Sequence, residues 1–224
     1  MNNKVLVVAA HPDDEVLGAG GAIINHVRDG DEVAILTMSD GETARSSGAD
    51  VRKRQLQCQQ VAKFLGCQRL ILNHLPDQRF DTVPFLDITQ KIEKIIYDDV
   101  RPDIVYTHCP YDLNMDHRII YQAVLTACRP GPSLCVKKLL SFETLSSTEW
   151  QMKDQANAFS PTYYTDITEH IYGKIEAMNL YRDEIRKYPH PRSAEGILTL
   201  AKYRGMQVGF KYSEAFQAIR ILNK

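Results

Sequence analysis

Short apolar runs alternate with longer amphipathic stretches through the first 142 residues of the chain. The runs with the length and composition of buried strands are 4–9, 32–38, 69–73, 103–107 and 137–142. Helical patterns separate them at 15–29, 49–65, 84–100 and 116–128. The alternation predicts an α/β fold: a doubly wound, Rossmann-like domain with helices on both faces of a parallel sheet of strand order 3-2-1-4-5.

The pattern changes after residue 142. A polar stretch at 143–162 is followed by predicted helices at 167–187 and 193–208 and by a strand-like segment at 212–221. We expect these residues to form a C-terminal helical and strand elaboration, so that residues 1–224 make a single domain with its core in 1–142. A chain of 224 residues with 44% hydrophobic content can bury about 70% of its unfolded surface in one domain.

Charge and composition exclude several partners. The formal net charge is −1 and the basic residues are scattered, so no nucleic acid partner is expected. No run approaches the roughly 20 apolar residues of a transmembrane segment, and the first apolar run is too short for a signal peptide, so we expect a cytoplasmic protein. The cysteines form no C-x-x-C pair and are expected to be reduced thiols, mostly in the core: Cys58, Cys67, Cys109, Cys128 and Cys135.

The loop after the first strand is crowded with acids. It reads His11-Pro12-Asp13-Asp14-Glu15, which places an imidazole and three carboxylates in five positions. Like charges this close repel one another, and a bound cation would remove the repulsion. Proline stiffens the turn, and residues His11 and Asp14, three apart, can converge on one point. The loop therefore predicts a divalent metal site, with Asp13 left over.

A dinucleotide-binding loop is the alternative at this position. Gly18, Gly20 and Gly21 lie nearby, but they form no G-x-G-x-x-G motif and fall a turn inside the predicted helix. Three acids would also repel a pyrophosphate group. We expect these glycines to let the first helix approach the sheet closely.

A second polar segment, Tyr111–His117, follows the fourth predicted strand. In the predicted sheet, strands one and four are neighbours at the point where the chain reverses direction, and ligands bind outside their carboxyl ends. His117 can therefore reach His11 and Asp14. Two imidazoles and one carboxylate leave open positions on an ion, as in catalytic sites. A histidine in the first turn of a helix would, taken alone, carry no such meaning.

These motifs resemble the PIG-L or LmbE-like zinc deacetylases, which remove N-acetyl groups from sugars and glycoconjugates. The resemblance covers nearly the whole chain, because further segments also match: Thr37–Glu42, Leu65–Gly66, Arg204–Gly205 and Ser213–Phe216. It implies that His11, Asp14 and His117 bind Zn²⁺, that Asp13 is the general base, and that the protein can form a homo-oligomer. Fe²⁺ is an alternative ion for these ligands.

The chain departs from part of this family at Asn114, where a histidine is thought to stabilise the oxyanion or donate a proton. An amide can donate a hydrogen bond but cannot titrate, so the acid role falls to Asp13 alone or to another group, for which His190 is the candidate. A solvated loop histidine between two prolines is the alternative for His190. Asp116 is expected to orient a neighbouring side chain, with helix capping as the alternative.

Substrate contacts are predicted at two positions. Arg54 matches a substrate-binding arginine of the family, although Gln57 stands where glutamate is common, and Arg52 is the alternative. Asp77 resembles a family aspartate that accepts hydrogen bonds from sugar hydroxyls, with a turn-forming role as the alternative. Supporting or packing roles are expected for His108 and Cys109, and core packing rather than sugar stacking for Trp150, Tyr163 and Tyr164.

Together these features predict a metal-dependent hydrolase that removes the N-acetyl group from an amino sugar, free or carried on a nucleotide, lipid or thiol. One alternative is hydrolysis of another N-acyl amide. Others are a non-catalytic, metal-containing sugar-binding module and a nucleotide-binding regulatory domain. Asp13 discriminates the enzyme from the binding module, because a binder has no use for a carboxylate that does not hold the metal.

Overall fold

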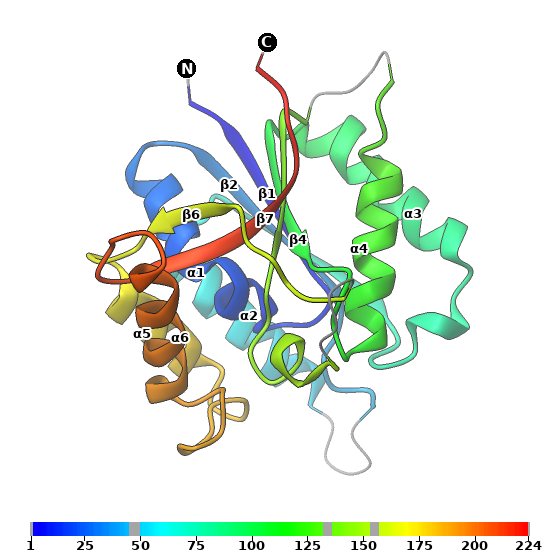
Figure 1. Cartoon of the computed structure of the whole chain (residues 1–224). Coiled ribbons are helices and arrows are strands. Elements are labelled where there is room, and N and C mark those ends of the chain that lie inside the picture. The colour runs from blue at the N-terminus through cyan, green and yellow to red at the C-terminus, as the bar shows by residue number, and fades with distance from the viewer. Residues whose placement is uncertain (1, 45–49, 132–135, 153–156, 224) are drawn as a thin grey trace.

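The computed structural model describes residues 2–44, 50–131, 136–152 and 157–223. Within them, seven strands form one sheet of order β3-β2-β1-β4-β5-β7-β6 (Figure 1). The strands are β1 (Lys4–Ala9), β2 (Glu32–Ser39), β3 (Arg69–Leu75), β4 (Ile104–His108), β5 (Lys138–Phe142), β6 (Tyr163–Asp166) and β7 (Ser213–Ile221). Strands β1 to β5 are parallel to their neighbours among these five.

The predicted sheet was incomplete, and the strand order of the whole sheet differs from the predicted one. The five parallel strands occur in the expected relative order, but β7 pairs antiparallel with β5, and β6 pairs antiparallel with β7. The sequence indicated β7 as a closing strand. It did not indicate β6, because an edge strand of three half-buried residues and one exposed residue shows no apolar alternation.

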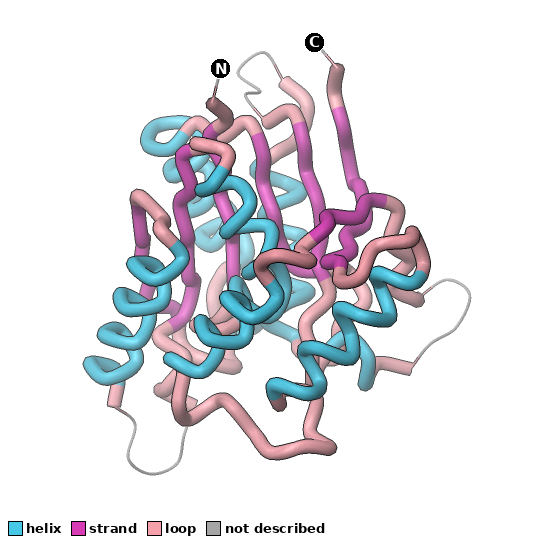
Figure 2. The backbone as a smooth tube through the Cα atoms, turned by 90° about the vertical axis from the view of Figure 1, so that its left-hand side faces the viewer, coloured by secondary structure: helices cyan, strands magenta, loops and turns pink. Residues whose placement is uncertain are grey.

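Helices cover both faces of the sheet (Figure 2). They are α1 (Asp14–Arg28), α2 (Val51–Leu65), α3 (Phe85–Lys94), α4 (Met115–Ala127), α5 (Ile171–Leu180) and α6 (Ala194–Met206). Helix α3 continues as a π-helical turn, Ile95–Val100. Residue 49, the predicted start of the second helix, lies outside the described residues. The predicted helix 167–187 was too long, since α5 ends at Leu180 and an irregular segment leads to α6.

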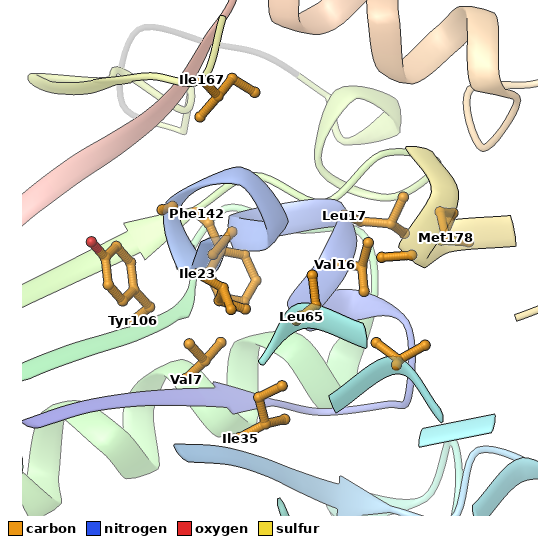
Figure 3. Packing of buried hydrophobic residues seen from close by; sticks show 14 of the residues in the cluster. Val7, Val16, Leu17, Ile23, Ile35, Leu65, Tyr106, Phe142, Ile167 and Met178 are labelled. Carbon is orange, nitrogen blue, oxygen red and sulfur yellow. The ribbon is translucent and has the colours of Figure 1, made fainter. Parts of the chain in front are cut away.

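Two apolar layers hold the helices to the sheet. Val5 and Val7 of β1 face α1, α2, α5 and α6, while Leu6 and Val8 face α3 and α4. Successive strand side chains point to opposite faces, so a strand buried on both sides must be apolar throughout. Figure 3 shows part of the first layer, in which side chains of α1 lie between the sheet and Met178 of α5.

The glycines of α1 allow the close approach predicted for them. A Cβ atom at Gly18 would lie 2.2 Å from Cδ2 of Phe142 on β5, and one at Gly21 would lie 2.5 Å from Cγ2 of Ile167. Both distances are shorter than van der Waals contact, so any larger residue would push α1 away from its neighbours. The predicted approach to the sheet is confirmed for Gly18, whereas Gly21 lies against Ile167 in the segment after β6.

In the described part of the chain, no helix is long and apolar enough to cross a membrane. Cys58, Cys109 and Cys128 are buried, Cys67 is half-buried, and all four are free thiols. The expectation of reduced cysteines mostly in the core is confirmed for these four, and Cys135 lies outside the described residues. Both chain ends lie at the edge of the sheet where the parallel strands begin, at the top of Figure 1.

Candidate metal centre and active site

Three side chains from two neighbouring strand ends meet at the carboxyl edge of the sheet. His11 lies in the loop after β1, Asp14 is the first residue of α1, and His117 lies in the first turn of α4. Nδ1 of His11, Oδ2 of Asp14 and Nε2 of His117 are each 3.2 Å from the other two atoms. All three residues are buried. The structure therefore brings the three predicted ligands together.

The geometry of this triangle fits a metal ion. Zinc ligands lie about 2.0–2.2 Å from the ion, and two such ligands in tetrahedral geometry are then about 3.3 Å apart. The observed separations of 3.2 Å match that value. Oδ1 of Asp14 is a buried oxygen without a hydrogen-bond partner among the described residues. Two imidazoles and a carboxylate suit Zn²⁺ or Fe²⁺ and leave coordination positions for other ligands.

Neighbouring acids orient the two histidine rings. Nε2 of His11 lies 3.1 Å from Oδ2 of Asp116 and 3.3 Å from Oδ1 of Asp77. Nδ1 of His117 lies 3.1 Å from Oδ1 of Asp112. In metal sites, a carboxylate commonly accepts the proton of the ring nitrogen that does not bind the ion, which fixes the tautomer. The group formed by His11, Asp77 and Asp116 is a second candidate ion cluster, but those acids also serve this orienting role.

The same acids make the site attractive to cations. Burial alone would lower the pKa of His11, but its bonds to Asp116 and Asp14 outweigh that effect and raise the pKa to about 10. Burial is likewise outweighed at His117, where Asp14 and Asp112 raise the pKa to about 9. A negative potential that draws protons onto two buried imidazoles also draws a divalent ion.

His108 is a supporting residue rather than a fourth ligand. Its Nε2 accepts a hydrogen bond from the backbone N–H of Ala10 at 2.9 Å, which occupies the lone pair. The ring stacks on that of His117, with 4.0 Å between centroids. Burial lowers the pKa of His108 to about 3, so the ring is neutral. Cys109 is also buried, and its thiol donates to the carbonyl of Tyr111.

Asp13 occupies a strained backbone position next to the triangle. Its φ of 113° is rare for any residue except glycine and costs on the order of 1–3 kcal/mol. The conformation is held by its carbonyl, which accepts from the N–H groups of Val16 and Leu17, and by its own N–H, which donates to Oε2 of Glu15. The hydroxyl of Tyr181 donates to the other Glu15 oxygen at 2.6 Å.

Arg192 contacts the carboxylate of Asp13. Nη1 of Arg192 donates to Oδ2 of Asp13 at 3.0 Å and to Oε2 of Glu184 at 3.1 Å, and Nε donates to Oγ of Ser146. Burial raises the pKa of Asp13 to about 7, although the guanidinium group opposes this shift. Asp13 is 2% exposed, and its carboxylate is held by Arg192 beside the triangle.

One pocket gives access to both Asp13 and His11. Its lining is almost entirely polar and comes from the loops after β1, β2, β3 and β4 and from the segment before α6: His11, Pro12, Asp13, Gly41, Asp77, Gln78, Asn114, Glu184 and Arg192. A Cβ atom at Gly41, whose φ is 68°, would lie 2.8 Å from Cδ of Pro12. Glycine at this position therefore lets the second loop pack against the first.

Asn114 caps helix α4, whereas Asp116 contacts His11. Asn114 is the N-cap of α4, because its Oδ1 accepts the N–H of Asp116 at 2.9 Å. Its Nδ2 donates to Oε1 of Gln78 at the pocket wall. Asp116 does not cap the helix. Its carboxylate contacts His11 and accepts the N–H of Phe80, which agrees with an orienting role.

The structure corrects the interpretation of Arg54. This residue is 2% exposed, and its guanidinium group forms ion pairs with Glu42 and Glu184. It therefore supports the pocket wall from behind rather than facing a substrate. Arg52, the alternative, is exposed on α2 and is not part of the pocket lining. Asp77 does line the pocket, and burial raises its pKa although His11 opposes the shift.

His190 does not line the pocket. Its Nδ1 accepts the N–H of Arg192, and its ring meets Trp150 edge to face with 5.8 Å between centroids. Trp150 is 52% exposed, so the core-packing expectation was wrong for this residue. Tyr163 packs on Phe216, in agreement with that expectation.

Sequence reasoning missed four residues of the site: Gln78, Asp112, Glu184 and Arg192. Asp112 lies in the polar segment after β4 that the sequence singled out, and Arg192 lies two residues after His190, between the helices predicted at 167–187 and 193–208. Both could have been found by treating every charged residue of those segments as a candidate. Glu184 fell within a predicted helix and gave no signal.

Comparison with known proteins places the chain in a family. The profile of the PIG-L family, described as GlcNAc-PI de-N-acetylase, matches residues 6–128. A relative in Escherichia coli, the uncharacterized deacetylase YaiS, is 30% identical over 166 residues, which cover 72% of this chain and 84% of that protein. The chain belongs to the PIG-L family of deacetylases.

More distant relatives match most of the chain in sequence or in structure. Diacetylchitobiose deacetylase of Thermococcus kodakarensis is 24% identical over 96% of this chain and 83% of its own length. The conserved protein TT1542 of Thermus thermophilus has a TM-score of 0.80 at 21% identity, covering 99% of this chain and 97% of its own. GalB of Pseudomonas putida, a 4-carboxy-2-hydroxymuconate hydratase, has a TM-score of 0.76 at 21% identity, covering 100% and 99%. The fold alone therefore does not specify the reaction.

Proposed function

We propose that this protein is a metal-dependent hydrolase that releases acetate from an N-acetylated amino sugar or glycoconjugate. The observation that carries the proposal is the triangle of His11, Asp14 and His117 with 3.2 Å sides, together with a pocket that is lined by both His11 and Asp13. Family membership and the deacetylase relatives support this reaction over hydration.

His11, Asp14 and His117 would hold Zn²⁺ or Fe²⁺. Such an ion supplies Lewis acidity, which lowers the pKa of water and polarises an amide carbonyl group. The protein's own residues then orient the ligands and move protons. Asp116 and Asp77 hold His11, and Asp112 holds His117, so that both imidazoles present the correct nitrogen.

Asp13 is proposed as the general base. It accepts a proton from the attacking water and returns one to the departing amine, which requires a carboxylate that is not itself a ligand. The hydrogen bond from Arg192 engages one oxygen, Oδ2, and fixes the plane of the carboxylate. No separate titrating group is then needed at Asn114.

The polar pocket wall supports a substrate rich in hydroxyl groups. Asp77 can accept hydrogen bonds from sugar hydroxyls, while the amides of Gln78 and Asn114 can donate and accept. We propose these residues, and not Arg54, as the sugar contacts. The lining has few apolar groups, which does not favour the N-acyl amides of apolar compounds.

An acetate-release assay tests the proposal. The protein is freed of metal, reconstituted with Zn²⁺ or Fe²⁺, and incubated with N-acetylglucosamine, diacetylchitobiose, a nucleotide-linked N-acetyl sugar and N-acetylated amino acids. We expect metal-dependent release from at least one sugar. Release only from amino acids would change the substrate class, and saturable sugar binding without release would favour a binding module.

A further inference from the structure

Helix α1 is interrupted just after the segment that carries the site. Ala19 has φ −143° and ψ 16°, outside the helical region. The first part contains Asp14, and the second part lies along the sheet toward Arg28. In an unbroken helix, the carbonyl of Leu17 would accept a hydrogen bond from the N–H of Gly21.

Each of these two backbone groups has a charged side chain as partner instead. The N–H of Gly21 donates to Oε1 of Glu214 at 2.8 Å, and the N–H of Ala22 donates to Oε2 at 2.7 Å. Nζ of Lys174 donates to the carbonyl of Leu17 at 2.8 Å and to Oε1 of Glu214 at 2.6 Å. An ion pair between α5 and β7 therefore bridges the break in α1.

The ion pair between Lys174 and Glu214 is buried away from water. Lys174 and Glu214 are each 5% exposed, and desolvation makes a buried ion pair a weak source of stability compared with apolar packing. Its presence is explained by the backbone groups that it satisfies, because unpaired groups at the break would be costly. A Cβ atom at Gly20 would lie 3.2 Å from Cγ of Lys174, so the lysine stem packs directly on the break.

Leu17 connects this pair to the site. Its N–H donates to the carbonyl of Asp13 at 3.0 Å, while its carbonyl is held by Lys174. We propose that Lys174 and Glu214 are positioning residues that fix the first segment of α1, and with it the strained backbone of Asp13 and the start of the helix at Asp14. The inference rests on the proposed function, since it assigns a catalytic consequence to a contact outside the pocket.

The test compares Lys174→Met, Glu214→Gln and the double variant with the wild-type protein. We expect amide exchange at Gly21 and Ala22 to accelerate at least about tenfold in Glu214→Gln. We also expect kcat for acetate release to fall about 10–100-fold in both single variants, KM to stay within about twofold, and affinity for Zn²⁺ to fall about tenfold. In the double variant, stability should recover because no charge is left unpaired, while kcat stays low.

A destabilised control separates positioning from general loss of stability. Ile171→Val removes one buried methyl group from the same helix, α5, and should leave kcat unchanged. The proposal is overturned if kcat in the Lys174 and Glu214 variants equals that of Ile171→Val. It is also overturned if kcat recovers together with stability in the double variant. If the single variants do not fold, Lys174→Arg and Glu214→Asp replace them, and we expect kcat to fall about threefold in each. A kcat equal to the wild-type value in both variants overturns the proposal.

The readouts also separate this proposal from the proposed function. If the wild-type protein releases no acetate from any sugar, the proposed function fails. Amide exchange at Gly21 and Ala22 and the affinity for Zn²⁺ then decide whether the pair positions α1, and unchanged values in Glu214→Gln overturn the inference.

Discussion

Nη1 of Arg192 lies 3.0 Å from Oδ2 of Asp13, although 179 residues separate them in the sequence. The same nitrogen lies 3.1 Å from Glu184. The irregular segment between α5 and α6 therefore supplies the cation that faces the acidic loop after β1. A guanidinium group can hold two carboxylates in fixed directions, which an ammonium group does less well.

Replacing this arginine should lower turnover without removing the metal. For Arg192→Lys we expect kcat to fall about tenfold, because the fork that orients Asp13 is lost. Metal content after dialysis should match that of the wild-type protein. Arg186→Lys is the matched control, because Arg186 is exposed in the same segment. Loss of metal in Arg192→Lys would show that this residue maintains the ligand cluster instead.

The variant His190→Ala tests whether His190 donates a proton to the leaving group, as the sequence suggested, or lies outside the active site, as its position in the structure indicates. If His190 donates a proton, His190→Ala should have a lower kcat than the wild-type protein and should retain its metal. The structure places its ring against Trp150 and outside the pocket lining, so we expect a change of less than about threefold. Steady-state kinetics of acetate release would settle the choice, and a loss near that of Arg192→Lys would return the acid role to His190.

Asp13→Asn should abolish most of the activity while the protein still binds its metal. The amide cannot accept the proton of water, and general base catalysis contributes about 10²–10⁴-fold. Asp40→Asn is the control, because Asp40 lies at the same edge of the sheet and, within the described part of the chain, accepts hydrogen bonds from the backbone N–H groups of Glu42 and Thr43. Activity of Asp13→Asn within a few-fold of the wild type would refute the base assignment.

His117→Ala should weaken metal binding. Removing one of three ligands leaves an imidazole and a carboxylate, and we expect affinity for Zn²⁺ to fall by at least about 100-fold. Metal content after dialysis against a weak chelator is the measurement. His74→Ala, which changes an exposed histidine of β3, should retain the wild-type content. Equal contents in the two variants would exclude His117 as a ligand.

A pH-dependent contribution to stability is expected from Asp31. Burial raises its pKa, but hydrogen bonds from His26 and Asn3 outweigh this and lower it below the usual 3.8. The ionised carboxylate therefore stabilises the folded state above about pH 4, and this contribution is lost as the pH falls through the lowered pKa. Asp31→Asn should cost about 1–2 kcal/mol at pH 7.

Urea unfolding at pH 7 and pH 3 measures this contribution. The difference between Asp31→Asn and the wild type should shrink at pH 3, because the wild-type carboxyl group then begins to lose its charge as well. Asp29→Asn, two residues away and exposed, should match the wild type at both values. An equal deficit at pH 7 and pH 3 would mean that packing, and not charge, accounts for the effect.

The parallel part of the sheet could be predicted because its strands are buried on both faces. Val5 to Val8 form an unbroken apolar run for this reason, and the intervening helices show one apolar face each. Strand β6 and the end of α5 could not be predicted in the same way. The segment after Leu180 leaves the helix where Glu184 pairs with Arg54, a contact 130 residues apart that local sequence does not reveal.

The same distinction applies to the site. His11, Asp14 and His117 could be predicted because strand order fixes which loops meet at the carboxyl edge. Arg192 could not, since its place depends on the path of an irregular segment rather than on the topology. Arg54 was misassigned for a related reason: its position on α2 was correct, but only tertiary packing decides whether an arginine there faces solvent or two buried glutamates.

The candidate ligands come from the loops after β1 and β4, whereas Glu184 and Arg192 approach from the far end of the chain. Residues 181–193 therefore supply no candidate ligand, although Tyr181 and Arg192 contact Glu15 and Asp13 beside the ligands. Grafting the equivalent stretch of a relative onto this scaffold would alter one side of the pocket and leave the segments that carry His11, Asp14 and His117 unchanged in sequence.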